Sequence, residues 1–193
     1  MARGPHAPET PAVTLRRVGV GAVLAWGLAA CASLNAGRAV GTAATAELHN
    51  AEGLVLGTAS FTQISAGVRI LVEMRGMPPG AKAVHIHEVG RCEGPAFASA
   101  GSHFNPEKRQ HGLLNPQGPH AGDLPNITID ADGSGRLETT TDRVTLGSGP
   151  TSVLGGDGHA LVVHGSPDDF MTDPTGNSGA RIACGVIVKQ EPQ

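Results

Sequence analysis

Apolar and polar residues alternate along much of the chain beyond residue 46. Val68, Ile70, Val72 and Met74 occupy every second position, and side chains at that spacing point to one face of a β-strand. Strand patterns rich in β-branched residues also occur in six other segments, namely 54–61, 83–89, 126–130, 136–141, 159–164 and 181–189. No segment has the 3.6-residue period of a long amphipathic helix. The pattern therefore predicts an all-β, antiparallel protein.

Two long irregular stretches separate these predicted strands. Residues 90–124 and 165–180 are rich in Gly, Pro, Asn and Asp. Loops of that length inside a compact domain are usually functional. We therefore expect an antiparallel β-barrel or sandwich with two functional loops on one side.

The stretch 130–135 resembles the start of a calcium-binding loop, with Asp130, Asp132 and Gly133 at matching positions. Its twelfth position is Thr141 instead of Glu, and no helix pattern flanks it. An Asp-Gly pair between two strands is typical of a hairpin turn. The hairpin is the interpretation we adopt.

The N-terminal segment has the features of an export signal. Arg16 and Arg17 precede an apolar run over residues 18–30, which is too short to cross a bilayer as a permanent helix. We predict that residues 1–30 form a signal peptide and that the protein is exported, to the periplasm or the cell surface.

The apolar run ends in Leu28-Ala29-Ala30-Cys31, which resembles the lipobox of bacterial lipoproteins. Cleavage there would make Cys31 the lipidated N-terminus and anchor the protein to the membrane. Residues 31–45 would then comprise the lipidated cysteine and a flexible tether of small and polar residues, ahead of a domain over residues 46–193. The alternative is a signal peptide without lipidation.

Charge and cysteine content narrow the picture further. A formal net charge of −3 gives no reason to expect nucleic acid as a partner. The chain has three cysteines, and lipidation of Cys31 would leave Cys92 and Cys184 as a pair. In an oxidising compartment these two residues are candidates for a disulfide.

Most of the nine histidines fall in a suggestive pattern. In a strand, His85 and His87 lie on one face because they are two residues apart. His103, His111, His120 and Asp123 follow within 21 residues, and His164 ends a later apolar segment. Imidazole and carboxylate donors in this number suit one zinc and one copper site, provided that one histidine is shared.

These residues, taken with their neighbours, resemble the copper-zinc superoxide dismutase family across nearly all of residues 46–188. The motifs that carry the resemblance are His85-x-His87, Gly101-x-His103-Phe104-Asn105-Pro106, His111-Gly112, His120-x-Gly122-Asp123-Leu124, Val162-Val163-His164 and Gly179-x-Arg181-x-x-Cys184-Gly185. The resemblance implies an eight-stranded Greek-key β-barrel, an architecture that is grouped with the sandwiches.

The resemblance also implies an activity, the dismutation of superoxide to dioxygen and hydrogen peroxide by copper alternating between Cu(II) and Cu(I). Arg181 would hold the anion beside the copper, and His103 would bridge the metals and deliver a proton. Asp168 would link a copper histidine to a zinc histidine. The implied ligands are His85, His87, His103 and His164 for one copper ion, and His103, His111, His120 and Asp123 for one structural zinc ion.

Some features depart from the family pattern or stay open. No lysine occurs in residues 169–179, where many relatives place one to steer superoxide; Lys108 and Arg109 are either substitutes or solvated charges. We expect His49 and His159 at the surface. Relatives include monomers and dimers, so a homodimer is possible. The alternatives to an enzyme are an exported copper- or zinc-binding protein without turnover and a structural surface lipoprotein.

Overall fold

The computed structural model describes residues 1, 2, 4 and 39–191. Cys31, nearly all of the predicted signal peptide and the first part of the predicted tether lie outside this range. Among the described residues, no helix is long and apolar enough to cross a membrane.

Ten strands form one antiparallel sheet, and the described residues include a single short helix, the 3₁₀ turn η1 (Ala98–Ala100). The all-β prediction is therefore confirmed. The strands are β1 (Ala39–His49), β2 (Val55–Ile64), β3 (Gly67–Met74), β4 (Gly80–Lys82), β5 (Val84–His87), β6 (Ile127–Ile129), β7 (Gly135–Thr141), β8 (Ala160–His164), β9 (Arg181–Val186) and β10 (Val188–Lys189).

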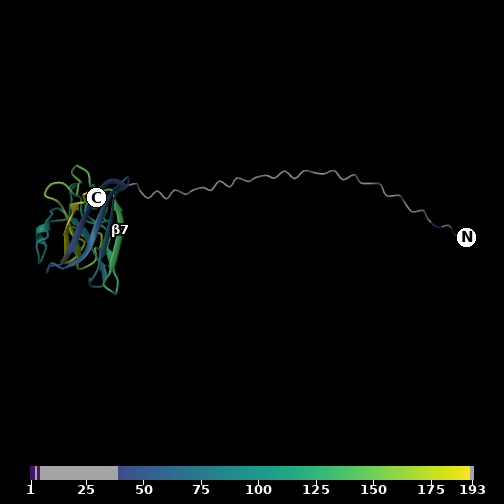
Figure 1. Cartoon of the computed structure of the whole chain (residues 1–193), viewed down its shortest axis with the longest axis horizontal. Helices are drawn as coiled ribbons and strands as arrows, with labels where there is room; N and C mark the ends of the chain where they lie inside the picture. Colours follow the sequence, from purple (N-terminus) through teal and green to yellow (C-terminus); the bar gives the residue numbers. More distant parts are fainter. Residues whose placement is uncertain (3, 5–38, 192–193) are drawn as a thin grey trace. The chain divides into compact units, whose positions relative to one another are not determined.

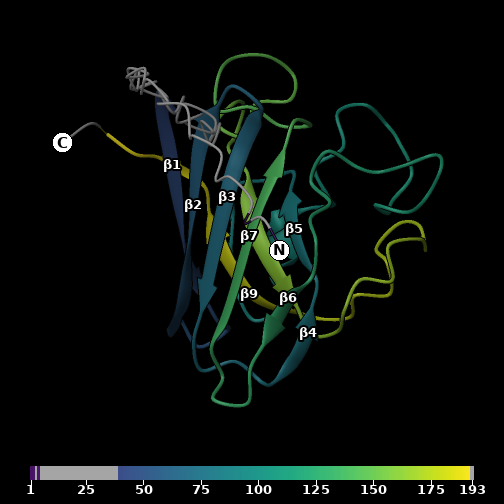
Figure 2. The same ribbon diagram turned by 90° about the vertical axis from the view of Figure 1, so that its right-hand side faces the viewer.

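The sheet curls into a nearly closed barrel. Its strand order is β4-β6-β7-β3-β2-β1-β9-β8-β5, with β10 beside β1. β4 and β5 stand at opposite ends of this order, yet only Ala83 separates them in the chain, so the two ends must approach each other. Figure 1 shows the barrel with β7 at one side, and in Figure 2 β1, β2, β3 and β7 form one wall with β5 and β9 lying behind it. The connection from β3 to β4 skips β7 and β6, as in a Greek key.

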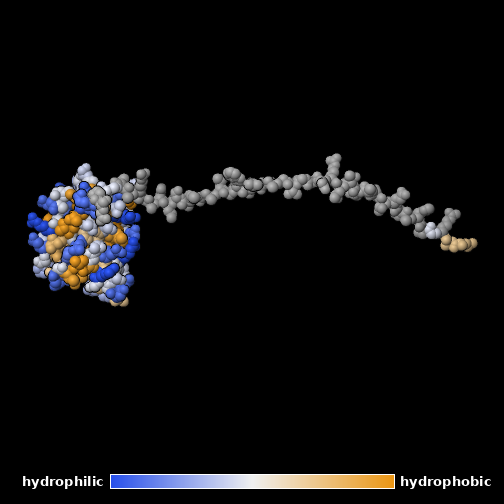
Figure 3. Space-filling view, viewed as in Figure 1, coloured by the Kyte–Doolittle hydropathy of each residue, from blue (hydrophilic) through white to orange (hydrophobic). Residues whose placement is uncertain are grey.

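The period-two pattern places the core as predicted. Val68, Ile70, Val72 and Met74 are each at most 1% exposed, while the intervening Arg69 and Glu73 face solvent. On the visible surface, hydrophobic side chains form limited areas among hydrophilic ones (Figure 3). Burial of the apolar face of each strand is thus the main source of the barrel's stability.

The predicted tether is wrong for residues 39–45, because they form the first part of β1. Ala44 pairs with Phe61 of β2 and, like Ala46 and Leu48, is fully buried in the core. Small residues at this end of the strand fit the crowded interior of the barrel, so a composition that suggested a flexible linker belongs to a core strand.

The interpretation of residues 130–135 as a hairpin turn is confirmed. The Ser134 amide donates to the Asp132 side chain and the Asp130 amide to the Ser134 carbonyl, and β6 and β7 pair on either side. Gly133 has φ +81°, a left-handed conformation that glycine adopts without strain.

The two predicted long loops are also present. One joins β5 to β6 and contains only η1, and the other joins β8 to β9 without a strand. They lie on the same side of the barrel (Figure 2) and are joined directly, since the Leu114 amide donates to the Phe170 carbonyl. Residues far apart in sequence are therefore brought together over one wall of the barrel.

Candidate metal centre

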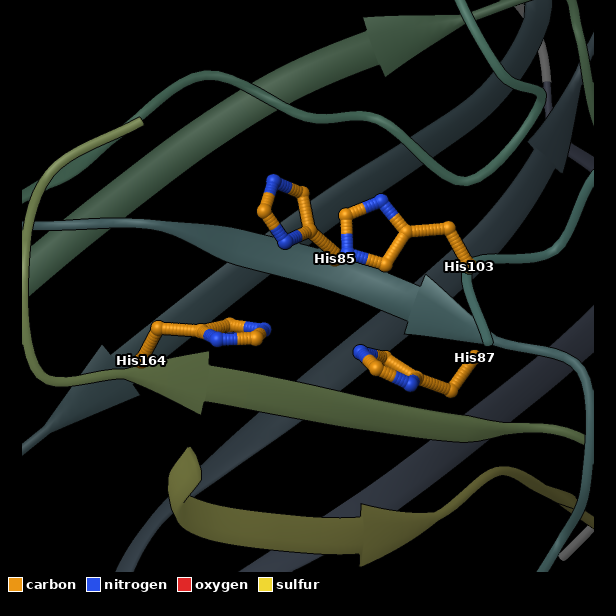
Figure 4. Close-up of side chains that lie close together, drawn as sticks. All are labelled: His85, His87, His103 and His164. Atoms are coloured by element: carbon orange, nitrogen blue, oxygen red, sulfur yellow. The ribbon is translucent and has the colours of Figure 1, made fainter. Parts of the chain in front are cut away.

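Four histidines converge beside the wall formed by β5 and β8. His85 and His87 lie on β5, His164 ends β8, and His103 lies in the loop after β5. Pairing of Val84 with Val163 sets β5 and β8 in register, and an isolated bridge joins His87 to His103. One ring nitrogen from each of the four lies within 4.8 Å of the others (Figure 4).

These imidazoles present nitrogen atoms that the protein leaves unpaired. Nδ1 of His85 and Nε2 of His87, His103 and His164 are buried without a hydrogen-bond partner among the described residues. The opposite nitrogens are engaged, as in His87, whose Nδ1 donates to the Gly101 carbonyl at 2.9 Å. Buried polar atoms without partners are costly unless they bind something. Four converging imidazole donors fit a copper ion.

Burial keeps these imidazoles neutral. It lowers the pKa of His87 to about 2, that of His164 to about 3 and that of His103 to about 4. The pKa of His85 is also lowered by burial. Metal ligation requires the neutral imidazole, so the free nitrogens are available at any pH near neutrality.

A second group of donors lies on the other side of His103. Nδ1 of His103 and Nδ1 of His111 are each 3.1 Å from Oδ1 of Asp123. Nδ1 of His120 lies 3.3 Å from the same oxygen and 3.4 Å from Nδ1 of His103. Three imidazoles and one carboxylate at one point fit the tetrahedral preference of zinc. His85 also comes within range of this group, because its ring centroid lies 4.0 Å from that of His103, with the two rings tilted relative to each other.

His103 faces both groups. Its Nε2 points to the histidines of β5 and β8, and its Nδ1 points to Asp123. One imidazole with its two nitrogens aimed at two donor sets has the geometry of a bridging ligand. The structure thus brings together every residue that the sequence analysis assigned to either metal.

Asp123 is held as a carboxylate. Burial acts to raise its pKa, but the hydrogen bonds from His103, His111 and His120 outweigh it and hold the pKa well below the usual range. Its Oδ2 also accepts the amides of Gly112 and His120, at 2.9 Å each. A fixed negative charge at this point suits a divalent cation.

Asp168 connects the two groups from behind. Its carboxylate lies 2.8 Å from Nε2 of His85 and 3.0 Å from Nε2 of His111. Asp169 is exposed, and its carboxylate accepts a hydrogen bond from the Thr172 hydroxyl instead. The sequence analysis missed Asn126. Its side chain donates to the main-chain carbonyl of Asp168 and accepts from the main-chain amide of Asp168. Only the fold reveals Asn126, since it lies 42 residues away in sequence.

We expect Asp168→Asn to weaken the binding of both metals by about 10- to 100-fold, the usual effect of losing a carboxylate that orients a ligating histidine. The asparagine side chain lacks the negative charge of the carboxylate that holds Nε2 of His85 and Nε2 of His111. Competition with a chromophoric chelator measures both affinities, and Asp169→Asn is the matched control. Equal effects of the two substitutions would contradict the role of Asp168.

In the metal-free protein, we expect stability to fall as the pH drops from 6.5 towards 4. The pKa values of about 2 to 4 for His87, His164 and His103 in the folded state compare with about 6.5 in the unfolded chain. The unfolded state therefore gains protons in this window, which costs up to ~1.4 kcal/mol per pH unit for each histidine.

His111 does not reverse this trend. Burial acts to lower its pKa, but hydrogen bonds to Asp123 and Asp168 raise the pKa to about 9, so below pH 6.5 its imidazole is protonated in both states. Urea unfolding of the metal-free protein at pH 7, 6 and 5 measures the trend. A stability that does not change over this range would contradict it.

Arg181 lies at the entrance to the four-histidine group. Its Nη1 donates to the Phe97 carbonyl at 2.6 Å and its Nη2 to the Gly101 carbonyl at 2.7 Å. The Gly101 carbonyl also accepts from His87, so the guanidinium is fixed beside a metal-group histidine. Arg181 and His103 line a hollow of about 450 Å³, large enough for a small anion.

The predicted disulfide is confirmed, as Cys92 and Cys184 are bonded. It ties the loop after β5 to β9, the strand that begins with Arg181. The prediction that His159 is a surface residue is wrong. It is 7% exposed, its Nδ1 lies 3.1 Å from the Val153 carbonyl, and its ring packs on Phe104 from the loop after β5. His49 is partly exposed, its side chain retaining 38% of its accessible surface.

Comparisons with known proteins agree with this geometry. A profile of the family described as copper/zinc superoxide dismutase (SODC) matches residues 55–187. The chain is 51% identical over 146 residues to Cu-Zn superoxide dismutase 2 of Aquifex aeolicus, covering 75% of this chain and 85% of the relative. It is 43% identical over 147 residues to the Cu-Zn superoxide dismutase of Caulobacter vibrioides, covering 75% and 84%.

A solved structure is similar throughout the barrel. A SOD-like protein from Bacillus subtilis matches with a TM-score of 0.72 and 38% sequence identity, over 75% of this chain and 97% of that chain. Most of the described residues therefore have counterparts in these relatives.

Proposed function

This chain belongs to the copper/zinc superoxide dismutase family, and we propose that it acts outside the cytoplasm as an exported enzyme anchored to the membrane through Cys31. The reaction converts two superoxide anions and two protons into dioxygen and hydrogen peroxide. One observation carries the assignment of the metal centre. Buried, unpaired ring nitrogens from β5, from β8 and from the loop after β5 converge on one point.

The proposed copper ligands follow from which nitrogens lack a partner, and the proposed zinc ligands follow from which donors gather around Oδ1 of Asp123. Copper would be held by Nδ1 of His85 and by Nε2 of His87, His103 and His164. Zinc would be held by Nδ1 of His103, His111 and His120 and by Oδ1 of Asp123. When bound, copper supplies a one-electron redox couple, and zinc supplies a fixed positive charge.

Two residues of the protein act on the reactants: Arg181 attracts the superoxide anion, and His103 carries a proton. Arg181 offers a permanent positive charge at the hollow, held in place by two main-chain carbonyls. His103 can hold a proton at Nε2, the nitrogen that faces the histidines of β5 and β8, while Asp123 keeps the ring oriented through Nδ1. The surrounding burial excludes bulk water from the histidines.

We expect Arg181→Gln to lower kcat/KM by about 10-fold, because the variant loses a charge that attracts and holds the anion. Arg181→Lys should recover part of the loss, since it keeps the charge but not the two-carbonyl geometry. Pulse-radiolysis rates with matched metal content measure this. Equal rates for the two variants would contradict a role for the charge.

The lipid anchor rests on the sequence Leu28-Ala29-Ala30-Cys31 and on the apolar run before it. Metabolic labelling with radioactive palmitate in a bacterial host tests it, with Cys31→Ser as the matched variant. Label on the natural chain and none on the variant would support the anchor. If the natural chain were exported but carried no label, the lipid anchor would be wrong and the proposed enzyme activity would be unaffected.

A homodimer is a further part of this proposal. Leu54 and Val55 at the start of β2 are 61% and 48% exposed. Leu54 borders a groove lined in part by Leu56, Met77 and Ile182, and exposed apolar surface of this kind is often buried between subunits. Sedimentation equilibrium against the chain mass of 19.5 kDa tests the dimer, and a monomer mass would remove it without affecting the reaction.

The experiment that tests the enzyme directly is metal analysis combined with an activity assay on the purified chain reconstituted with copper and zinc. About one copper and one zinc per chain, with catalytic removal of superoxide, is the expected result. Tight metal binding without turnover would instead indicate a metal-binding protein.

A further inference from the structure

Ser178 is a buried polar side chain that the proposed reaction does not use. It lies in the loop between β8 and β9 and is fully buried. Its Oγ is 3.1 Å from Nδ1 of His164, and the same Nδ1 is 3.3 Å from the main-chain carbonyl of Gly179. Nε2 is the unpaired nitrogen of this ring. Two oxygens from adjacent residues therefore face the nitrogen of His164 that is not proposed to bind copper.

The main chain holds the Ser178 hydroxyl in this position. The Ser178 amide donates to the Thr175 carbonyl at 3.3 Å, and the Ser178 carbonyl accepts the Ser166 amide at 2.9 Å. His164 is held as well, since its amide donates to the Ala83 carbonyl at 2.9 Å. Because both main chains are fixed, the contact between Oγ and Nδ1 is built into the loop.

Copper binding sets the direction of this hydrogen bond. A neutral imidazole carries one N–H, so a His164 ring that binds copper through Nε2 carries its proton on Nδ1. That N–H donates, and the Ser178 hydroxyl oxygen and the Gly179 carbonyl oxygen are its acceptors. The hydroxyl therefore acts on the copper ligand as an acceptor.

Other copper histidines have different partners behind them. His85 has a carboxylate, 2.8 Å from its Nε2. The Gly101 carbonyl accepts from His87 but also accepts from Arg181, at 2.7 Å. Of the four copper histidines, His164 is the one with a side-chain hydroxyl as a partner in the described part of the chain. A change at this hydroxyl therefore acts on the copper centre through one ligand.

We propose that Ser178 is a positioning residue that favours the Cu(II) state of the centre by accepting a hydrogen bond from His164. An acceptor at the Nδ1–H group makes the imidazole a stronger donor at Nε2. Cu(II) gains more from a stronger nitrogen donor than Cu(I), which is the softer ion. The hydroxyl thereby lowers the reduction potential of the copper. This role rests on the copper ligands proposed above.

A redox titration of the copper- and zinc-loaded full chain with ferrocyanide and ferricyanide, at constant pH, measures this role. One electron passes from ferrocyanide to Cu(II), which gives ferricyanide and Cu(I). We expect Ser178→Ala to shift the equilibrium about three-fold towards Cu(I), which is a rise of about 30 mV at about 59 mV per factor of ten. The shift is small because the Gly179 carbonyl still accepts from Nδ1.

Ser166→Ala is the matched control for the titration. Ser166 is an exposed serine of the same loop, and the substitution leaves its main-chain amide in place. The reduction potential of this variant should equal that of the natural chain, because the hydroxyl at Ser178 is retained.

Competition with chelators separates this effect from structural damage. Ser178→Ala should weaken the affinity for Cu(II) about three-fold and leave the affinities for Cu(I) and zinc nearly unchanged, whereas a loosened loop would weaken Cu(II) and Cu(I) binding alike. Thermal unfolding establishes that both variants fold. An unchanged potential in Ser178→Ala, or an equal loss of affinity for both oxidation states, would overturn the proposal. A natural chain that bound no copper would overturn the proposed copper ligands instead.

Discussion

Replacing His164 by alanine is expected to abolish copper binding and to lower superoxide dismutation by at least ~100-fold, more than the loss of a group that merely orients a ligand. His164 ends β8 and supplies one of the four unpaired nitrogens of the copper group. Zinc should be retained, because His164 is not among the donors around Asp123.

Metal analysis and an activity assay on the same sample measure both effects. His49→Ala is the matched control, since His49 lies outside both donor groups and is partly exposed. It should retain both metals and full activity. A His164→Ala protein that kept copper and activity would contradict the assignment of the copper ligands.

Removal of the disulfide is expected to lower the free energy of unfolding by about 4 to 5 kcal/mol. Cys92 and Cys184 are 92 residues apart, and the chain-entropy estimate for closing a loop of that length gives this figure. At about 2–4 °C per kcal/mol for a domain of this size, the melting temperature should fall by roughly 8–20 °C.

The double variant Cys92→Ser and Cys184→Ser, loaded with both metals, provides the measurement by calorimetry. Its activity should also fall, because the loop after β5 carries the Phe97 and Gly101 carbonyls that hold Arg181. A Cys31→Ser variant should melt like the natural chain. A melting temperature within about 2 °C of the natural protein would contradict the structural role of the disulfide.

Strands with a clear alternation were predictable from sequence, and those without one were not. The β3 pattern identified its buried face because one side of that strand is apolar and the other polar. The first part of β1 was misread because its small residues lack that contrast, although they pair with β2 and Ala44 is buried in the core. The three-residue β4 was missed because it is too short to show a period.

Outside the strands, it was harder still to predict from sequence which residues are exposed and which are buried. His159 is polar and out of phase with His164, which suggested exposure, but Phe104 from the loop after β5 packs on its ring and the residue is buried. No local pattern reports what another part of the chain will cover. The same reason explains why Asn126 was missed as the support of Asp168.

The sequence by itself determined the donor residues, the strand on which His85 and His87 share a face, the two long loops and the cysteine pair. These depend on residue type and on spacing within single segments, which the chain carries locally. Tertiary structure decided that Asp168 rather than Asp169 reaches the histidines, that Arg109 rather than Lys108 lines the hollow, and that His103 faces both donor groups. Those choices depend on how the barrel closes and how its loops meet, because adjacent residues point in different directions and only their distant neighbours distinguish them.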